Sequence, residues 1–95
     1  MSMPKAYVLI VNESGTEDSI ISNLNGIESV KEAHGTFGSY DILTKLESNG
    51  EQKIQQDISN KIRKIHNIRS TLTLLVNEKE NFRKIGKSEK AVLVS

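Results

Sequence analysis

The chain has 95 residues, of which 36% are hydrophobic, and its formal net charge is +1. This length suits one domain with a single core, so a second independent domain is not expected. A near-neutral chain has no overall basic footprint for nucleic acid, and the absence of cysteine excludes disulfides and thiolate metal sites. The charge is uneven, because residues 1–50 carry seven acids and three bases, whereas residues 51–95 carry five acids and ten bases. We interpret this as solvated helix surface followed by a basic tail, and a weak nucleic-acid contact is the alternative that stays open.

Targeting and membrane signals are not visible in the sequence. No apolar run approaches the roughly 20 residues that a membrane-spanning helix needs. Residues 1–4 lack a basic region followed by a hydrophobic stretch, so no secretory signal is predicted. We therefore expect a cytoplasmic protein without a membrane partner.

The first predicted elements are a strand and a short helix. Residues 6–11 form a continuous apolar run rich in β-branched types, which is typical of a strand buried on both faces. Thr16 is the predicted helix N-cap, because two carboxylates follow it in the first turn. Apolar residues then recur at helical spacing until Asn25 and Gly26 end the helix.

A β-hairpin is predicted next, with strands over residues 27–37 and 40–47. Gly38 and Ser39 reverse the chain between them, because a tight turn needs a backbone φ > 0 that glycine adopts readily. Alternation along the first strand predicts that four side chains share one face: Val30, Glu32, His34 and Thr36.

The clearest helical period in the sequence belongs to four isoleucines, at residues 54, 58, 62 and 65. Their spacing predicts a helix over residues 51–66, which Asn67 closes. A final strand is expected over residues 68–77, with Leu72 and Leu74 on one face and Thr71 and Thr73 on the other. Residues 79–95 form a charged C-terminal tail, which could close with a short strand at a sheet edge or on a neighbouring subunit.

The predicted order is strand, helix, strand, strand, helix, strand. It indicates an α+β, ferredoxin-like βαββαβ fold over residues 1–78, with two helices on one face of a four-stranded antiparallel sheet. No helix covers the other face of this sheet, although it carries many apolar side chains. A homodimer that packs sheet to sheet, as in dimeric α+β barrels, would bury this face.

The hairpin turn is the candidate functional element. Gly38 gives the turn its geometry, but a polar Ser39 and a carboxylate at Asp41 are not needed by a core. The alternative that these residues serve only as turn chemistry remains open. His34 and His66 lack the further ligands that a metal site needs, so neither a metal nor a cofactor is predicted.

Three segments of the chain resemble the effector-binding domain of the Lrp/AsnC regulators, the module called RAM. They are the segment 27–33 leading into the second strand, the Gly-x-aromatic-Asp turn at residues 38–42, and the entry to the last strand at residues 65–73. The resemblance covers residues 4–77.

The resemblance implies a small effector, often an amino acid, bound between dimers beside the turn after the second strand. Backbone groups of Gly38 and Ser39 would approach the effector, Asp41 would pair with an α-amino group, and Tyr40 would wall the pocket. Hydroxyl groups would come from Thr36, Thr71 and Thr73.

Two departures from the family pattern change what is expected. Asn67 stands where the family commonly has glycine, and asparagine tolerates the left-handed conformation. There is also no N-terminal helix-turn-helix. The resemblance therefore implies a stand-alone module that senses an effector or modulates a regulator of transcription, and that does not bind DNA specifically by itself. It also implies a homodimer or larger homo-oligomer, which could join a full-length regulator.

Two other hypotheses about the function of the chain stay open. An enzyme of the small monooxygenase type shares the dimeric α+β barrel, but it would need a His or Asn facing a closed apolar cleft, and the sequence offers only His34. No nucleophile–base arrangement, phosphate loop or paired carboxylate is visible, so the chain is not predicted to be an enzyme. The other reading is a pure protein-assembly module.

Overall fold

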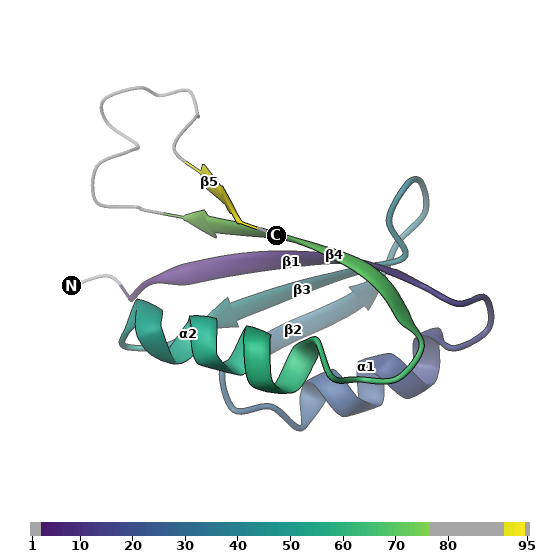
Figure 1. The fold of residues 1–95 in the computed structure, drawn as a ribbon, viewed down its shortest axis with the longest axis horizontal. Coiled ribbons are helices and arrows are strands. Elements are labelled where there is room, and N and C mark those ends of the chain that lie inside the picture. The colour runs from purple at the N-terminus through teal and green to yellow at the C-terminus, as the bar shows by residue number, and fades with distance from the viewer. Residues whose placement is uncertain (1–2, 77–90, 95) are drawn as a thin grey trace.

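Two helices lie on one face of an antiparallel sheet in the computed structural model of the chain, which describes residues 3–76 and the backbone of residues 91–94 (Figure 1). The elements up to β4 follow the predicted order. They are β1 (Lys5–Asn12), α1 (Glu17–Asn25), β2 (Val30–Gly35), β3 (Ile42–Glu47), α2 (Glu51–Asp57) with its π-helical continuation η1 (Ile58–Ile62), β4 (Ile68–Val76) and β5 (Ala91–Val94).

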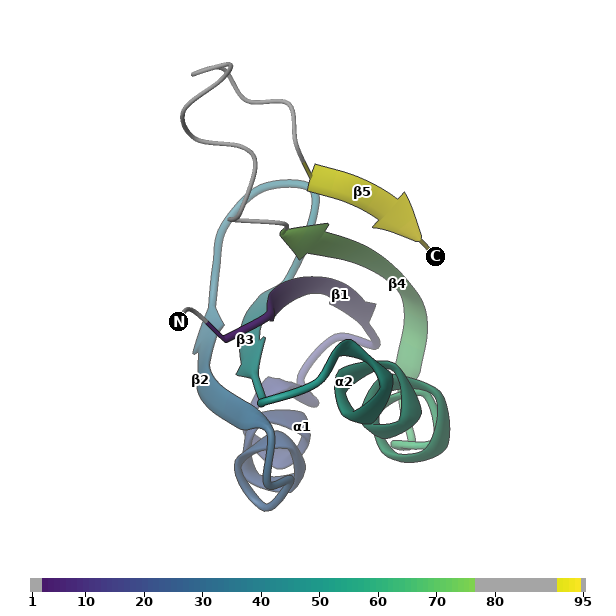
Figure 2. The ribbon, with the colours of Figure 1, turned by 90° about the vertical axis from the view of Figure 1, so that its left-hand side faces the viewer.

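The sheet has the strand order β2-β3-β1-β4-β5, and every neighbouring pair is antiparallel. Figure 2 shows both helices on the same side of the curved sheet. The first four strands and the two helices confirm the ferredoxin-like α+β fold, and β5 extends the sheet beyond β4. Residues 77–90 lie outside the described residues, so the division between a domain at 1–78 and a tail at 79–95 stays a prediction.

Burial along β1 alternates, and this corrects the expectation that the strand is buried on both faces. Ala6, Val8 and Ile10 are fully buried under the helices. Tyr7 and Leu9 point to the opposite face and stay partly exposed. The reason is that both helices of this antiparallel sheet cover the same side, so a single chain leaves the other side open.

The core lies between the sheet and the helices. Ile20 and Leu24 of α1 and the isoleucines at 54, 58 and 62 pack there against the buried side chains of β1 and β3. The isoleucine spacing therefore predicted the buried face of the second helix correctly. Burial of this face is what stabilises such short helices, since isolated helices of this length are marginal in water.

Several element boundaries differ from the sequence predictions, and β3 begins at Ile42 rather than at residue 40. The second helix ends at Ile62 rather than at residue 66, and its last turn is widened, because the amide of Arg63 donates to the carbonyl of Ile58 at 3.0 Å. Asn67, with φ 76°, turns the chain into β4 as expected. Strand β2 is shorter than predicted at both ends, since it occupies only Val30–Gly35.

The pairing of β2 with β3 is irregular between Val30 and Glu32, so the predicted common face is wrong at Val30, whereas Glu32 and His34 do lie on one face. Val30 faces Leu46, and Glu32 faces the next residue, Lys45, which leaves an extra residue on β2. As a result Val30 packs against the core together with Ala33, and Glu32 lies on the other side.

The open face of the sheet carries a patch of partly exposed apolar side chains. Leu9 on β1 pairs with Leu43 on one side and Leu72 on the other, and Tyr7 pairs with Leu74. We call these five residues the open-face patch.

No helix within the described part of the chain is long and apolar enough to cross a membrane.

Candidate functional site

The hairpin turn between β2 and β3 projects from one end of the sheet and is braced by its own backbone (Figure 1). The hydroxyl of Thr36 donates to the carbonyl of Tyr40 at 2.8 Å, and the amide of Thr36 donates to the carbonyl of Asp41 at 2.8 Å. Gly38 has φ 115°, a conformation that a side chain would strain. Phe37 at the tip is fully exposed. The predicted residues from Thr36 to Asp41 thus form one ordered loop.

Asp41 fastens this loop to the end of the central strand. One carboxylate oxygen, Oδ2, accepts a hydrogen bond from the backbone amide of Asn12 at 2.9 Å. The amide of Asp41 donates to the carbonyl of Ile10 at 2.8 Å. A carboxylate has about four acceptor positions, so this half-buried side chain keeps capacity for a further donor.

Asn12 is the residue at this site that sequence reasoning missed. Its side-chain amide donates to the carbonyl of Glu13 at 2.8 Å and to Oγ1 of Thr16 at 3.3 Å. Its own oxygen, Oδ1, is buried and has no hydrogen-bond partner among the described residues. The available signal was a polar residue that ends a buried apolar run.

Thr16 occupies the N-cap position of α1 as predicted, but its side chain does not cap the helix. Its hydroxyl donates instead to the carbonyl of Glu13 at 2.7 Å. Together with Asn12, it therefore stabilises the loop that follows β1, on the side where the hairpin turn is attached.

The two threonines of β4 that were predicted to reach the turn differ in their position along the strand. Thr71 pairs with Ile10, whose carbonyl binds the amide of Asp41, so it lies one strand away from the turn. Thr73 pairs with Val8 and is buried between sheet and helices. Its hydroxyl has no partner among the described residues. Within a single chain the structure does not bring Thr73 to the turn.

His34 lies on the exposed edge strand rather than in a closed apolar cleft. Its Nε2 is 3.1 Å from Oε1 of Glu32, and both side chains are more than half exposed. The hydrogen bond with His34, and then the charge of Lys45, lower the pKa of Glu32. Within the described residues, no group of three potential ligands could hold a metal ion.

The fold and the turn define a class, namely an α+β domain with an open apolar sheet face and a braced loop that carries a carboxylate. Residues 5–83 match the family described as the Lrp/AsnC ligand binding domain. The chain belongs to this family, and the resemblance of its three segments is thereby confirmed.

Solved structures of similar fold support this assignment. FFRP-DM1 is 33% identical, with a TM-score of 0.74 over 79% of this chain and 100% of that chain. A hypothetical protein from Pyrococcus horikoshii is 32% identical, with a TM-score of 0.75 over 85% of this chain and 96% of that chain.

E. coli AsnC is 29% identical, with a TM-score of 0.73 over 88% of this chain and 57% of AsnC. This chain thus spans little more than half of AsnC. A Neisseria meningitidis transcriptional regulator in complex with L-Met is 9% identical, with a TM-score of 0.70 over 82% of this chain and 52% of that one, and shows likeness of fold alone. The comparison with curated protein sequences gave no match.

Proposed function

We propose that this chain is an effector-binding module that takes an α-amino acid at the hairpin turn and modulates transcription without binding DNA itself. The observation that carries the proposal is Asp41, a carboxylate held in place at the turn with acceptor capacity to spare. Membership of a ligand-binding family supports it, and a regulator of the same fold forms a complex with L-Met.

The chemistry of the turn suits the two charged groups of an amino acid. Asp41 would accept a charge-assisted hydrogen bond from the ammonium group, which is worth about 1.5–3 kcal/mol. The backbone amide of Asn12 holds one oxygen of this carboxylate in place for that contact. Backbone amides of Gly38 and Ser39 would meet the carboxylate, and Tyr40 and Thr36 would border the ligand.

Assembly is the second part of the proposal. A homodimer would bury the open-face patch, in which Leu9 lies directly between Leu43 and Leu72. Further association of dimers would enclose the turns, and neighbouring copies would then supply side chains that a single chain lacks.

Regulation would act through protein contacts. That the chain does not bind DNA by itself is part of the proposal, and among the described residues both helices pack their buried side chains against the sheet. A full-length regulator with a similar ligand-binding domain is therefore the expected macromolecular partner.

Thermal unfolding in the presence of each of the twenty amino acids tests the proposal. A ligand at 100 times its Kd should add about 2.7 kcal/mol to the free energy of unfolding. Asp41→Asn keeps an oxygen that can accept from the amide of Asn12 but removes the charge, so it should reduce the stabilisation by about half or more. Asp18→Asn, at an exposed acid of α1, is the control and should preserve it.

The outcome also separates the alternative of a pure assembly module. If no amino acid stabilises a well-folded oligomer, the effector proposal fails and the open-face patch remains as the functional surface. If a ligand stabilises wild type and Asp41→Asn equally, a ligand exists but the assignment of its site to the turn is wrong.

A further inference from the structure

We propose that a pocket at the opposite end of β3 from the hairpin turn is a second binding site, for a small zwitterion of the α-amino-acid class. The six residues of β3 rise about 3.3 Å each, which places the pocket roughly 20 Å from the turn. The inference therefore does not depend on the effector site proposed above.

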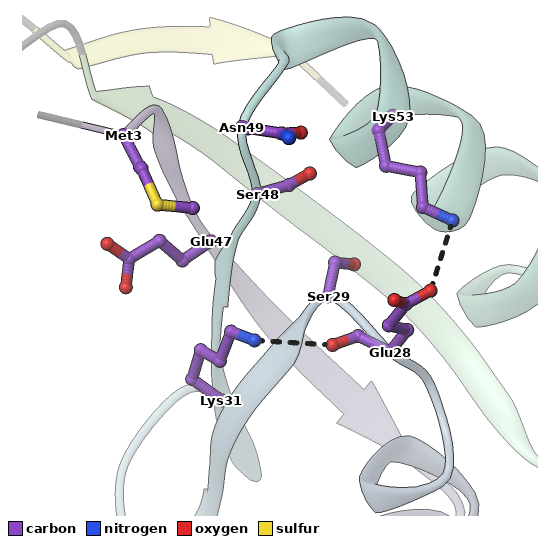
Figure 3. Close-up of a pocket in the computed structure, with 8 residues that line it drawn as sticks. All are labelled: Met3, Glu28, Ser29, Lys31, Glu47, Ser48, Asn49 and Lys53. Atoms are coloured by element: carbon purple, nitrogen blue, oxygen red, sulfur yellow. Dashed lines mark hydrogen bonds and ion pairs between the residues drawn. The ribbon is translucent and has the colours of Figure 1, made fainter.

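The pocket forms where four segments of the chain meet (Figure 3). Met3 precedes β1, Ser29 and Lys31 flank the start of β2, Asn49 follows β3, and Lys53 belongs to α2. Its volume is 340 Å³. This is at the lower end of the range of small-molecule sites, about 300–1,000 Å³, and it suits a ligand the size of an amino acid.

The charges that line the pocket are balanced. Lys31 and Lys53 contribute two ammonium groups, and Glu28 and Glu47 contribute two carboxylates. A simple anion would be attracted by the lysines but repelled by the carboxylates. A simple cation would be attracted by the carboxylates but repelled by the lysines. A molecule that carries both charges can complement both pairs, which is why the lining favours a zwitterion.

One wall of the pocket is braced by a buried hydrogen bond and by two ion pairs of the half-exposed Lys53. The hydroxyl of Ser29, which is only 2% exposed, donates to Oδ2 of Asp57 at 2.7 Å. Nζ of Lys53 lies 3.5 Å from Oδ1 of Asp57 and 3.8 Å from Oε1 of Glu28. The amide of Glu47 donates to the carbonyl of Ser29 at 2.8 Å. These contacts fix Ser29 and the backbone of Glu47 at this wall before a ligand arrives, which lowers the cost of binding.

Lys31 is the group best placed to receive the ligand's carboxylate. Its ammonium makes one long hydrogen bond, 3.4 Å, to the backbone carbonyl of Glu28 (Figure 3), and an ammonium has three donors. Glu47 also lines the pocket, and its carboxylate would accept from the ligand's ammonium group. Ser48 and Asn49 add neutral polar groups, and Met3 supplies an adaptable apolar surface.

Chemical-shift mapping of the full chain by ¹H–¹⁵N NMR tests the site. Each of the twenty amino acids is added at about 10 mM, which exceeds the Kd of a millimolar site. At least one should shift the backbone amides of Ser29, Lys31 and Ser48 in a saturable manner. Asp41→Asn should leave these shifts in place.

Two charge-removing variants and one control make the test specific. Lys31→Gln and Glu47→Gln should each raise the Kd at this pocket roughly tenfold or more, since each removes a charge-assisted contact. Lys64→Gln, at an exposed lysine outside the pocket, should not change it. Retained affinity in both pocket variants would overturn the proposal.

Three further outcomes would also overturn it. Chemical-shift changes confined to residues 36–41 would exclude the second site but support the proposed effector site. No chemical-shift changes at all would also exclude the second site. If inorganic phosphate alone produced the same shifts at the pocket, the site would be an anion site and the zwitterion would be wrong.

Discussion

The two faces of the sheet are built from the same strands but differ in how completely they are covered. On the helix side of β1 and β3, aliphatic side chains such as Val8 and Ile42 are completely buried. On the other side, Leu9 and Leu43 alternate with them along the same strands and remain partly exposed. The chain therefore completes one core by itself and leaves a second apolar surface partly exposed, and such surfaces often mark interfaces. Substitutions on the two faces should thus have different kinds of consequence.

The largest expected effect is on the helix side. Ile58→Asp would place an unpaired carboxylate at a position that is only 4% exposed. Burying such a charge costs more than most small domains can lose, since their total stability is about 5–15 kcal/mol. We expect the variant to be unfolded by circular dichroism at 25 °C.

Ile58→Val is the matched control, and it should cost only about 0.5–1.5 kcal/mol. If Ile58→Asp melted like the wild type, the position would not be in the core and the packing of η1 would be misplaced.

The next largest effect is expected on the open face, and it concerns association rather than folding. Leu74→Asp adds a charge to the open-face patch, where water can still solvate it in the monomer. We expect the melting temperature of the monomer to change little and the Kd of the homodimer to rise at least about 100-fold, or about 2.7 kcal/mol. Sedimentation equilibrium over a concentration series measures this, and an unchanged Kd would exclude the patch from the interface.

This contrast between the faces was visible in the sequence of β4 and of the second helix, but not in β1, which was predicted to be buried on both faces. The contacts between distant segments were not visible either. Strict alternation predicted the sides of Leu72 and Thr73, and the isoleucine period predicted the buried side of the second helix. The bond from the amide of Asn12 to Asp41 spans 29 positions, and the bond from Ser29 to Asp57 spans 28. No local pattern of hydrophobicity encodes such pairs, because they depend on how strands and helices meet in space.

For the same reason, only part of the candidate site could be predicted. The turn from Thr36 to Asp41 carries its own signal, because glycine and aspartate at that spacing reverse a chain. Thr73 was assigned to the site by resemblance, and in the single chain it lies in the core. The irregular pairing after Val30 and the widened turn of η1 left no sequence signal that we recognised.

A medium effect is expected at Asp57, the carboxylate buried in the helix layer. Burial raises its pKa and is the largest single influence, but the hydrogen bond from Ser29 and the charges of Lys53 and Lys61 together lower the pKa below its usual value. Asp57→Asn keeps an acceptor for Ser29 and removes the charge. Because both lysines are roughly half exposed and can be solvated, we expect a loss of about 1–2 kcal/mol at pH 7.

The pH dependence of this loss identifies its origin. The folded pKa of Asp57 is lower than the unfolded value of about 3.9, so the ionised group stabilises the fold above that value. The contribution disappears as the pH falls through the folded pKa. Chemical denaturation of wild type and Asp57→Asn should give a constant difference between pH 5 and 7 that narrows below about pH 4. A difference independent of pH would show that the charge of Asp57 does not contribute.

The smallest effect is expected on the exposed edge of the open face, where Glu32 and His34 form a pair that water surrounds. His34→Ala removes the hydrogen bond that most lowers the pKa of Glu32, so that pKa should rise while Lys45 still holds it down in part. The melting temperature should not change measurably, because exposed pairs contribute little to folding. A carboxyl ¹³C titration in the monomeric Leu74→Asp background measures this pKa without interference from association. The same titration at several protein concentrations, in a chain that keeps Leu74, shows how far the interface extends. A pKa of Glu32 that depends on protein concentration would place β2 inside the interface. A pKa that does not depend on it would confine the interface to the strands that carry the open-face patch.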